Sequence, residues 1–192
     1  MFPRQLSLGA MPASNLVYEM GAAIAEQCKR LGIQVNYAPV ADINNNPANP
    51  VINDRSFGQN KKIVTDYSIA YMKGMQDNGV MATAKHFPGH GDVSVDSHLD
   101  IPIINKSKEQ LDSMELVPFR ALINAGVESI MVAHLSVPTI DPTKNLDKRM
   151  LAMKGMCFDC VQEYEQKLNI PVLLPIQEGV DKLIPILKAL KN

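Results

Sequence analysis

A phrase that recurs at a nearly constant spacing is the feature that most constrains the fold of this chain. In each copy a helix-like stretch ends in Gly or Asn and a short β-branched run follows: Leu31-Gly32-Ile33-Gln34-Val35, Asn78-Gly79-Val80-Met81-Ala82, Ala125-Gly126-Val127-Glu128-Ser129 and Leu168-Asn169-Ile170-Pro171-Val172. The residue after the Gly or Asn falls at 33, 80, 127 and 170, so the repeats span 47, 47 and 43 residues. Gly and Asn readily adopt the left-handed conformation that ends a helix. The phrase therefore predicts repeated helix-to-strand units.

The segments between these copies have the apolar spacing of helices. Helices are predicted over residues 14–30, 60–77 and 177–190, and another is predicted to begin at the Ser107–Gln110 capping box. Strands are predicted over residues 34–40, 80–85, 129–133 and 171–174. Short apolar strands that alternate with helices are typical of an α/β fold with parallel strands, which helices bury on both faces.

Two architectures satisfy this pattern, an open parallel sheet and a (β/α)8 barrel. Long, polar loops rich in Pro and Asn follow the carboxyl ends of the predicted strands, where barrel enzymes carry their catalytic residues. A complete barrel has eight strands and takes about 250 residues, whereas this chain has 192 residues. By this count the chain is short for a barrel, and its predicted strands make up half of one.

Composition and charge exclude several classes of function. Hydrophobic residues make up 46% and charged residues 20% of the chain, as in an ordinary globular domain. A formal net charge of -1 gives no basic field for nucleic acid or for an anionic membrane surface. The sequence contains no apolar run of about 18 residues that would span a membrane, and its first residues lack the pattern of a signal peptide. Cys28, Cys157 and Cys160 match no disulfide framework, and the C-x-x-C pair is interpreted as two helix cysteines.

The loop after the first predicted strand, residues 38–58, contains a single arginine among many turn-forming residues. Asn, Asp and Pro at this density predict a rigid loop held by hydrogen bonds from side chains to the backbone. Arg55 can act there as a bidentate clamp on a polar ligand, or it can pair with Asp42 or Asp54. The loop by itself favours neither interpretation.

The end of the second predicted strand carries the densest cluster of ionisable groups in the chain. Its members are Lys85, His86, His90, Asp92, Asp96, His98 and Asp100. In one interpretation its histidines together with Asp92 and Asp96 bind zinc or iron, although their spacing matches no common metal signature. In the other, Asp96-Ser97-His98 is a proton-transfer dyad, in which the carboxylate fixes the imidazole tautomer and raises its basicity. Lys85 and His86 then donate hydrogen bonds to substrate hydroxyls.

At this cluster the sequence resembles a known family. Lys85-His86-Phe87-Pro88-Gly89-His90-Gly91-Asp92, followed by Asp96-Ser97-His98, resembles the signature of glycoside hydrolase family 3, most closely its bacterial β-N-acetylglucosaminidase (β-N-acetylhexosaminidase) branch. Other stretches are similar to the same family: Phe2-Pro3, Leu8-Gly9-Ala10, Ala38-Pro39-Val40-Ala41-Asp42, Asn49-Pro50-Val51-Ile52, Arg55-Ser56-Phe57-Gly58 and Met131-Val132-Ala133-His134. The resemblance extends from residue 2 to residue 142.

The resemblance implies a (β/α)8 TIM-type barrel and retaining hydrolysis of terminal β-linked N-acetylglucosamine. His98 would be the general acid/base, assisted by Asp96. The sugar hydroxyls would be bound by Arg55, Lys85 and His86, and His134 matches a further family position. The implied partner is a carbohydrate, an N-acetylglucosaminide such as one derived from peptidoglycan, and neither a cofactor nor a metal is implied. Because an imidazole replaces the usual carboxylic acid and suits an anionic acceptor, phosphorolysis stays open.

A retaining glycosidase also needs a carboxylate nucleophile. In the family this Asp stands two residues before a stretch like Leu151-Ala152-Met153-Lys154-Gly155, and here that position is Arg149. The nucleophile is therefore unknown and not present in this chain. We expect a discontinuity at residues 145–151 and the last βα unit of the barrel at about residues 170–192, so that residues 1–192 form a partial barrel domain.

Two alternative functions stay open. One is a sugar-binding fragment that is catalytically incomplete, and the other is a metal-dependent hydrolase that uses the His86–His98 loop. Chelation of metal would abolish the activity of a metal-dependent hydrolase and leave the activity of a glycosidase unchanged. The location is expected to be cytoplasmic, or periplasmic or secreted if a missing N-terminal segment carries a signal.

Overall fold

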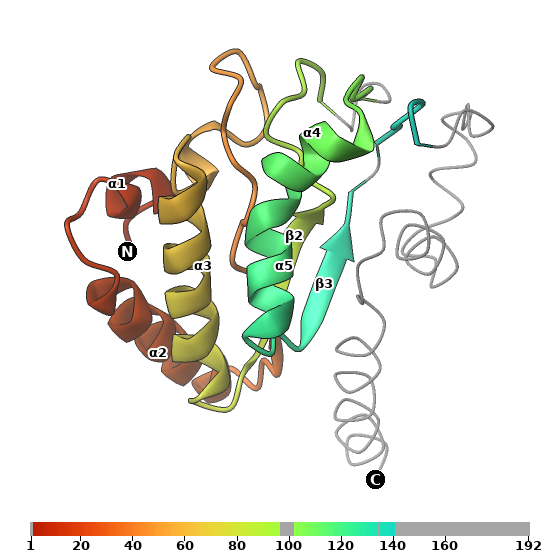
Figure 1. The fold of residues 1–192 in the computed structure, drawn as a ribbon. Helices are drawn as coiled ribbons and strands as arrows, with labels where there is room; N and C mark the ends of the chain where they lie inside the picture. The colour runs from red at the N-terminus through yellow and green to blue at the C-terminus, as the bar shows by residue number, and fades with distance from the viewer. Residues whose placement is uncertain (1, 97–101, 134, 141–192) are drawn as a thin grey trace, which may run out of the picture.

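The computed structural model describes residues 2–96, 102–133 and 135–140 of the chain. Its helices are α1 (Gln5–Gly9), α2 (Asn15–Arg30), the 3-10 helix η1 (Asn53–Arg55), α3 (Lys61–Gln76), α4 (Lys108–Ser113) and α5 (Leu116–Asn124) (Figure 1). Its strands are β1 (Val35–Asn36), β2 (Met81–Phe87) and β3 (Ser129–Val132), which form one parallel sheet in the order β1-β2-β3. The predicted strand 171–174, the predicted helix 177–190, the discontinuity at 145–151, and Cys157 and Cys160 lie outside the described residues.

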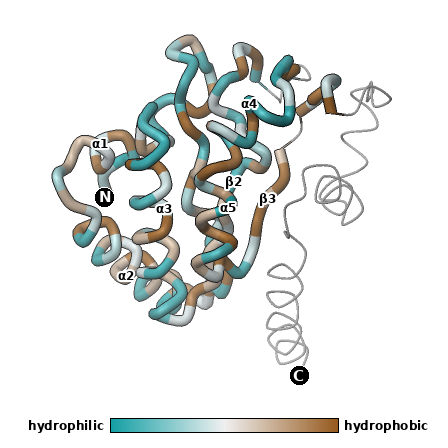
Figure 2. The backbone as a smooth tube through the Cα atoms, viewed as in Figure 1, coloured by the Kyte–Doolittle hydropathy of each residue, from teal (hydrophilic) through white to brown (hydrophobic). Residues whose placement is uncertain are grey.

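The hydrophobic core lies between the helices and the sheet. Buried apolar side chains from α3, β2 and α5 form it, among them Val64, Met72, Ala82, Ala84, Phe119 and Leu122. Figure 2 shows that β3 is largely hydrophobic, whereas much of the loop sequence above the strands is hydrophilic. No helix in the described part of the chain is long and apolar enough to cross a membrane.

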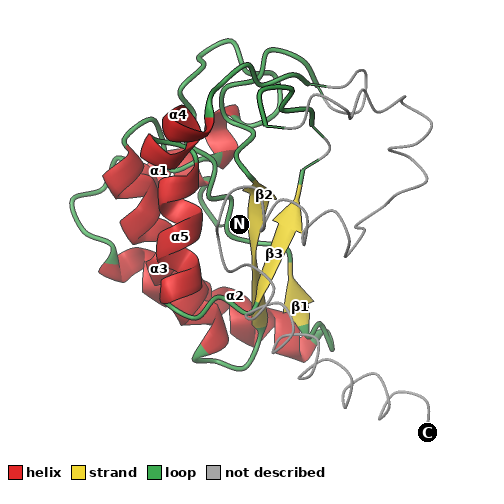
Figure 3. Ribbon diagram, turned by 45° about the vertical axis from the view of Figure 1, so that its right-hand side comes forward, coloured by secondary structure: helices red, strands yellow, loops and turns green. Residues whose placement is uncertain are grey.

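The described helices cover one face of the sheet. In two views turned by 45°, α2, α3 and α5 lie together on the same side of β1, β2 and β3 (Figures 1 and 3). The strands follow one another in chain order, and each strand is parallel to the next. A doubly wound open sheet reverses its strand order and carries helices on both faces, whereas a barrel wall has this sequential, one-sided arrangement.

The glycines of the recurring phrase adopt the conformation that the sequence predicts. Gly32, Gly79 and Gly126 have φ angles of 72°, 78° and 86°, in the left-handed region. A Cβ atom built on any of these residues meets no atom within 4 Å. Glycine is therefore required there by the backbone conformation and not by a close neighbour.

The first strand is shorter than predicted. The prediction extended it over residues 34–40, but β1 contains only Val35 and Asn36. The backbone N–H of Ala38 donates to the carbonyl of Asn36 at 2.8 Å, and this tight turn takes the chain out of the ladder. Pairing with β2 resumes as an isolated bridge between Val40 and Lys85. The strand is therefore interrupted, although both ends of the predicted segment still pair with β2.

The helix predicted after residue 107 is divided into α4 and α5. The capping box is present, since Gln110 N–H donates to the Ser107 hydroxyl and the Gln110 side chain accepts from Ser107 N–H. The helix ends at Met114, whose backbone is non-helical. Pro118 lies four residues later, lacks an N–H and would crowd the Met114 carbonyl in a continuous helix. The chain therefore restarts as α5 at Leu116.

Candidate active site

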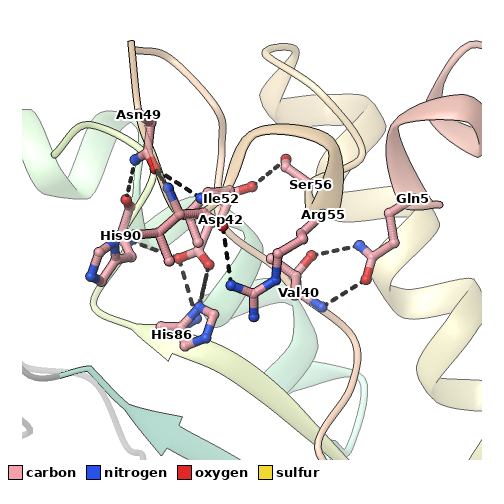
Figure 4. Close-up of polar contacts among 10 residues, drawn as sticks. Gln5, Val40, Asp42, Asn49, Ile52, Arg55, Ser56, His86 and His90 are labelled. Atoms are coloured by element: carbon pink, nitrogen blue, oxygen red, sulfur yellow. Dashed lines mark hydrogen bonds and ion pairs between the residues drawn. The ribbon is translucent and has the colours of Figure 1, made fainter. Parts of the chain in front are cut away.

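The carboxylate of Asp42 connects the loops that follow β1 and β2. Asp42 is fully buried. Its Oδ1 accepts the backbone N–H of His90 at 2.7 Å, and both carboxylate oxygens accept the N–H of His86 at 3.2 Å. The Oδ2 atom also lies 2.7 Å from Nδ1 of the His86 ring (Figure 4). One acidic side chain therefore fixes the backbone of residues 86–90 and the orientation of an imidazole.

The environment of Asp42 determines its charge. Burial opposes ionisation, but the charge of His86, the hydrogen bond from its ring and the backbone N–H groups of His90 and His86 outweigh it, so the pKa of Asp42 lies below its ordinary value. An ionised carboxylate can only accept hydrogen bonds. Nδ1 of His86 must therefore carry the hydrogen, and Nε2 is the nitrogen that can meet a ligand. This is the tautomer control that the sequence analysis assigned to Asp96 and His98.

The loop after β1 is rigid, as its Asn and Pro content predicted. The Asn49 carbonyl accepts the backbone N–H groups of Val51 and Ile52 at 2.9 and 2.8 Å, and its amide donates to the His90 carbonyl at 2.7 Å. The Ser56 hydroxyl donates to the Asp42 carbonyl at 2.6 Å. Side chains of one loop therefore hold the backbone of both loops (Figure 4).

Arg55 pairs with neither of the acids considered for it. Its guanidinium donates to the Val51 carbonyl at 3.1 Å. Asp54 instead pairs with Arg4, and Asp42 pairs with His86. Within the described residues Arg55 thus has no carboxylate partner, and its guanidinium is available to a polar ligand.

Lys85 lies near Arg55 and lines the same cavity. Tyr37, Tyr71 and Gln5 are also part of its wall. Burial lowers the pKa of Lys85, the Arg55 charge lowers it further, and Asp42 opposes the shift. Two cations that share a cavity without a carboxylate from the described residues provide hydrogen-bond donors for hydroxyl or other oxygen ligands.

His90 does not face this cavity as a ligand-binding group. Its side chain is buried, and in the part of the chain that the structure describes neither ring nitrogen has a hydrogen-bond partner. Burial lowers the pKa of His90 despite the opposing charge of Asp42, so the ring is neutral at pH 7. Its ring packs edge-on against His86 at a centroid distance of 5.9 Å.

The metal interpretation gains no support from the part of the chain that the structure describes. There, no three His, Cys, Asp or Glu side chains converge in a way that could hold a metal ion. His86 is engaged with Asp42, and Asp92 is paired with Lys106. His98 and His134 lie outside the described residues.

Asp96 is the described member of the predicted dyad. Its charge acts on the ring of His90, whose pKa it tends to raise. The structure therefore brings Arg55, Lys85 and His86 together around Asp42 and places Asp96 near the buried His90. Asp42 was considered in the sequence only as a partner for Arg55. The signal for its larger role is its place just after a strand end, in Ala38-Pro39-Val40-Ala41-Asp42.

Comparison with known proteins identifies the family of the chain. The profile of the glycosyl hydrolase family 3 N-terminal domain matches residues 1–159. Beta-hexosaminidase A of Pseudoalteromonas piscicida is 40% identical over 147 residues, which are 74% of this chain and 25% of that protein. The chain therefore spans a quarter of the length of this relative.

Solved structures similar to this chain include a member of the same family. A glycoside hydrolase family 3 beta-N-acetylglucosaminidase from Paenibacillus sp. str. FPU-7 is 45% identical with a TM-score of 0.71, over 73% of this chain and 27% of that one. NagZ from Neisseria gonorrhoeae, solved in complex with N-trifluoroacetyl-D-glucosamine, is 33% identical with a TM-score of 0.67, over 72% of this chain and 43% of that one. The parallel sheet and its helices are thus part of a TIM-barrel-type fold, and the barrel interpretation is confirmed.

Proposed function

The chain belongs to glycosyl hydrolase family 3, and on this premise we propose that it carries the sugar-binding and acid/base half of a β-N-acetylglucosaminidase. The substrate of that enzyme is a glycan with terminal β-linked N-acetylglucosamine, of the kind found in peptidoglycan. The observation that carries the proposal is the cluster of Arg55, Lys85 and His86 at the carboxyl ends of β1 and β2, organised by the buried carboxylate of Asp42.

The three basic side chains suit the binding of a sugar. Arg55 and Lys85 present N–H donors to one cavity, and the ring of His86 is held so that Nε2 is its remaining polar atom. Sugar hydroxyls are good acceptors for such donors, and a fixed donor set distinguishes their orientations because each unmatched polar group is left without a partner. Asp42 contributes by holding His86 and does not itself contact the sugar.

Proton transfer is assigned to the Asp96-Ser97-His98 segment. In this role His98 protonates the leaving oxygen and then removes a proton from water, and Asp96 fixes the imidazole tautomer and stabilises its charged form. Retention of configuration requires a carboxylate nucleophile on the opposite face of the sugar. The nucleophile is not assigned to any residue of this chain. His134 is retained as a further candidate contact.

A leaving-group comparison tests the assignment to His98. In a form of the protein that also contains the nucleophile, we expect His98→Ala to reduce turnover of alkyl N-acetyl-β-glucosaminides by about 100-fold or more, because removal of a general acid typically costs about 10²–10⁴-fold. Aryl glycosides with good leaving groups need less protonation and should lose much less. Equal losses on both substrates would contradict proton donation by His98.

Two controls address the alternatives. Full activity in the presence of a chelator excludes the metal-dependent hydrolase, whereas loss of activity would favour it. Replacement of water by phosphate as the acceptor, followed by analysis for a glycosyl phosphate, separates phosphorolysis from hydrolysis. Saturable sugar binding without turnover by the 192-residue chain would identify it as the catalytically incomplete sugar-binding fragment.

A further inference from the structure

Lys106 forms ion pairs with two residues to which the catalytic assignment gives no role, Asp92 and Glu115. Its ammonium lies 2.8 Å from Oδ2 of Asp92 and 2.5 Å from Oε1 of Glu115. The same Glu115 oxygen accepts the Asn45 amide at 2.9 Å. Asp92 of the loop after β2 and Glu115, the residue before α5, thus meet at Lys106, and Asn45 of the loop after β1 contacts the same Glu115 oxygen. Lys106 and Asp92 are part-exposed, while the Glu115 side chain is 1% exposed.

Asp92 and Lys106 stand at the two ends of the loop that contains Asp96 and His98. We call residues 90–93 the leading stem and residues 102–106 the return stem. The ion pair between Asp92 and Lys106 connects one stem to the other.

Each stem is also held from outside the loop. The Asn46 amide donates to the Val93 carbonyl at 3.2 Å on the leading stem. On the return stem, Ile104 N–H donates to the Ser136 carbonyl and Ser136 N–H donates to the Pro102 carbonyl, both at 2.9 Å. Described hydrogen bonds therefore connect the two stems to the segments that follow β1 and β3.

Glu115 is buried against the loop after β2 and pairs with Lys106. A Cβ atom at Gly89 would lie 2.8 Å from the Glu115 Cβ, so this side chain packs directly against the loop after β2. The Oε2 atom of Glu115 is buried and has no hydrogen-bond partner among the described residues. The other carboxylate oxygen of Glu115 accepts hydrogen bonds from the Lys106 ammonium and the Asn45 amide. Removal of the lysine would leave a buried carboxylate with only a neutral partner, which strongly disfavours the present arrangement.

We propose that Lys106 and Glu115 are positioning residues that fix both stems of the acid/base loop against the sugar-binding residues. The inference rests on the proposed role of His98 and adds the device that holds its loop in register. Misplacement of a catalytic group by about 1 Å can reduce turnover about 100-fold. Loss of this anchor should therefore affect proton transfer more than sugar binding.

The test compares Lys106→Met, which removes the charge, with Lys106→Arg, which keeps it. In a form of the protein that also contains the nucleophile, we expect Lys106→Met to lower kcat for alkyl N-acetyl-β-glucosaminides about 10- to 100-fold, with a smaller loss for aryl glycosides and KM within about twofold. Lys106→Arg should recover most of kcat. Glu115→Gln, which keeps the size of the side chain, should likewise change the ratio of alkyl to aryl glycoside turnover. Lys62→Met is the matched control, because Lys62 forms an exposed ion pair with Asp66 on α3.

Amide hydrogen exchange provides a readout that does not depend on catalysis. The N–H groups of Ile104 and Ser136 should exchange about 10-fold faster in Lys106→Met, while those of β2 stay protected. Unchanged exchange at both amides would overturn the anchoring of the stems. Faster exchange with an unchanged ratio of alkyl to aryl turnover would overturn the positioning role. If His98→Ala shows no leaving-group dependence while the two amides lose protection, the proposed function fails and the anchor stands.

Discussion

Asp42 has the most consequential environment of any single residue in the described part of the chain. It is buried, ionised and surrounded by donors from His86 and His90. Because the donors come from the end of β2 and from the loop after it, the same carboxylate that sets the His86 tautomer also fixes the backbone beside Lys85. The chemistry of the site and its folding are therefore linked at one residue.

This linkage predicts a pH-dependent stability difference. Because the folded pKa of Asp42 lies below its unfolded value, its carboxylate stabilises the fold above the unfolded pKa of about 3.9, and this contribution is lost as pH falls through the folded pKa. We expect Asp42→Asn to lower the free energy of unfolding at pH 7 by about 3 kcal/mol. The difference from wild type should narrow below about pH 4. Urea unfolding at several pH values measures both.

The control for this prediction is Asp54→Asn. Asp54 pairs with Arg4 at the surface, where the two side chains are 45% and 70% exposed. Such a pair contributes at most about 1 kcal/mol, so the variant should remain close to wild type at every pH. A difference between Asp42→Asn and wild type that stays constant down to pH 2 would contradict the role given to the Asp42 charge.

At the scale of elements, the contact between α2 and α3 depends on two glycines. A Cβ atom at Gly74 of α3 would lie 2.1 Å from the Tyr18 carbonyl of α2, and one at Gly21 would lie 2.6 Å from the Tyr71 carbonyl. These are backbone atoms, which cannot turn away as a flexible side chain can. The two helices therefore approach each other closely only because both positions lack a side chain.

We expect Gly74→Ala to destabilise the protein by about 1–3 kcal/mol through overpacking, despite the higher helix propensity of alanine. Gly126→Asn is the matched control, since that position has open space around it and a left-handed backbone that Asn tolerates. It should change stability by less than about 1 kcal/mol. Thermal unfolding compares the two, and equal stability of Gly74→Ala and wild type would contradict the close helix contact.

Most elements could be predicted from local patterns, and the errors have local causes. The bounds of α2 and α3 agree with the predicted helices to within one residue, and Asn60 and the Ser107–Gln110 box cap their helices. Ser14 occupies its cap position without a side-chain hydrogen bond, because its backbone is already helical. β1 ends early because of a tight turn, and the predicted helix divides at Met114 because of Pro118. In both places the apolar periodicity of the sequence continues past the interruption.

At the scale of the whole molecule, the site required more than periodicity. The Lys85–His98 cluster was visible because its residues are close in sequence, and the family resemblance supplied their roles. The contacts of Asp42 with His86 and of Glu115 with Asn45 join residues 44 and 70 positions apart. Such pairs depend on which loops the parallel strands bring together at one edge, which a local pattern does not encode. Lys106 and Glu115 were missed for this reason.

The chain spans a quarter of the length of one hexosaminidase relative and 27–43% of the two solved neighbours described above. Sugar recognition is nevertheless assigned to residues that all lie at the carboxyl end of β2 or in the loop after β1. Binding can therefore be measured separately from hydrolysis, which also needs a nucleophile. This separation makes affinity for the monosaccharide the most direct test of the site.

The deciding measurement is titration of the protein with N-acetylglucosamine by calorimetry or NMR, with Lys85→Met and Lys61→Met in parallel. Lys61 is the control. It is an exposed lysine at the start of α3, and its ammonium donates to the Ser113 carbonyl at the surface. We expect saturable binding that weakens about 10-fold or more in Lys85→Met, as loss of a charged hydrogen bond predicts, and stays unchanged in Lys61→Met. Absence of saturable binding, or equal affinity of wild type and Lys85→Met, would contradict a sugar site at the carboxyl ends of β1 and β2.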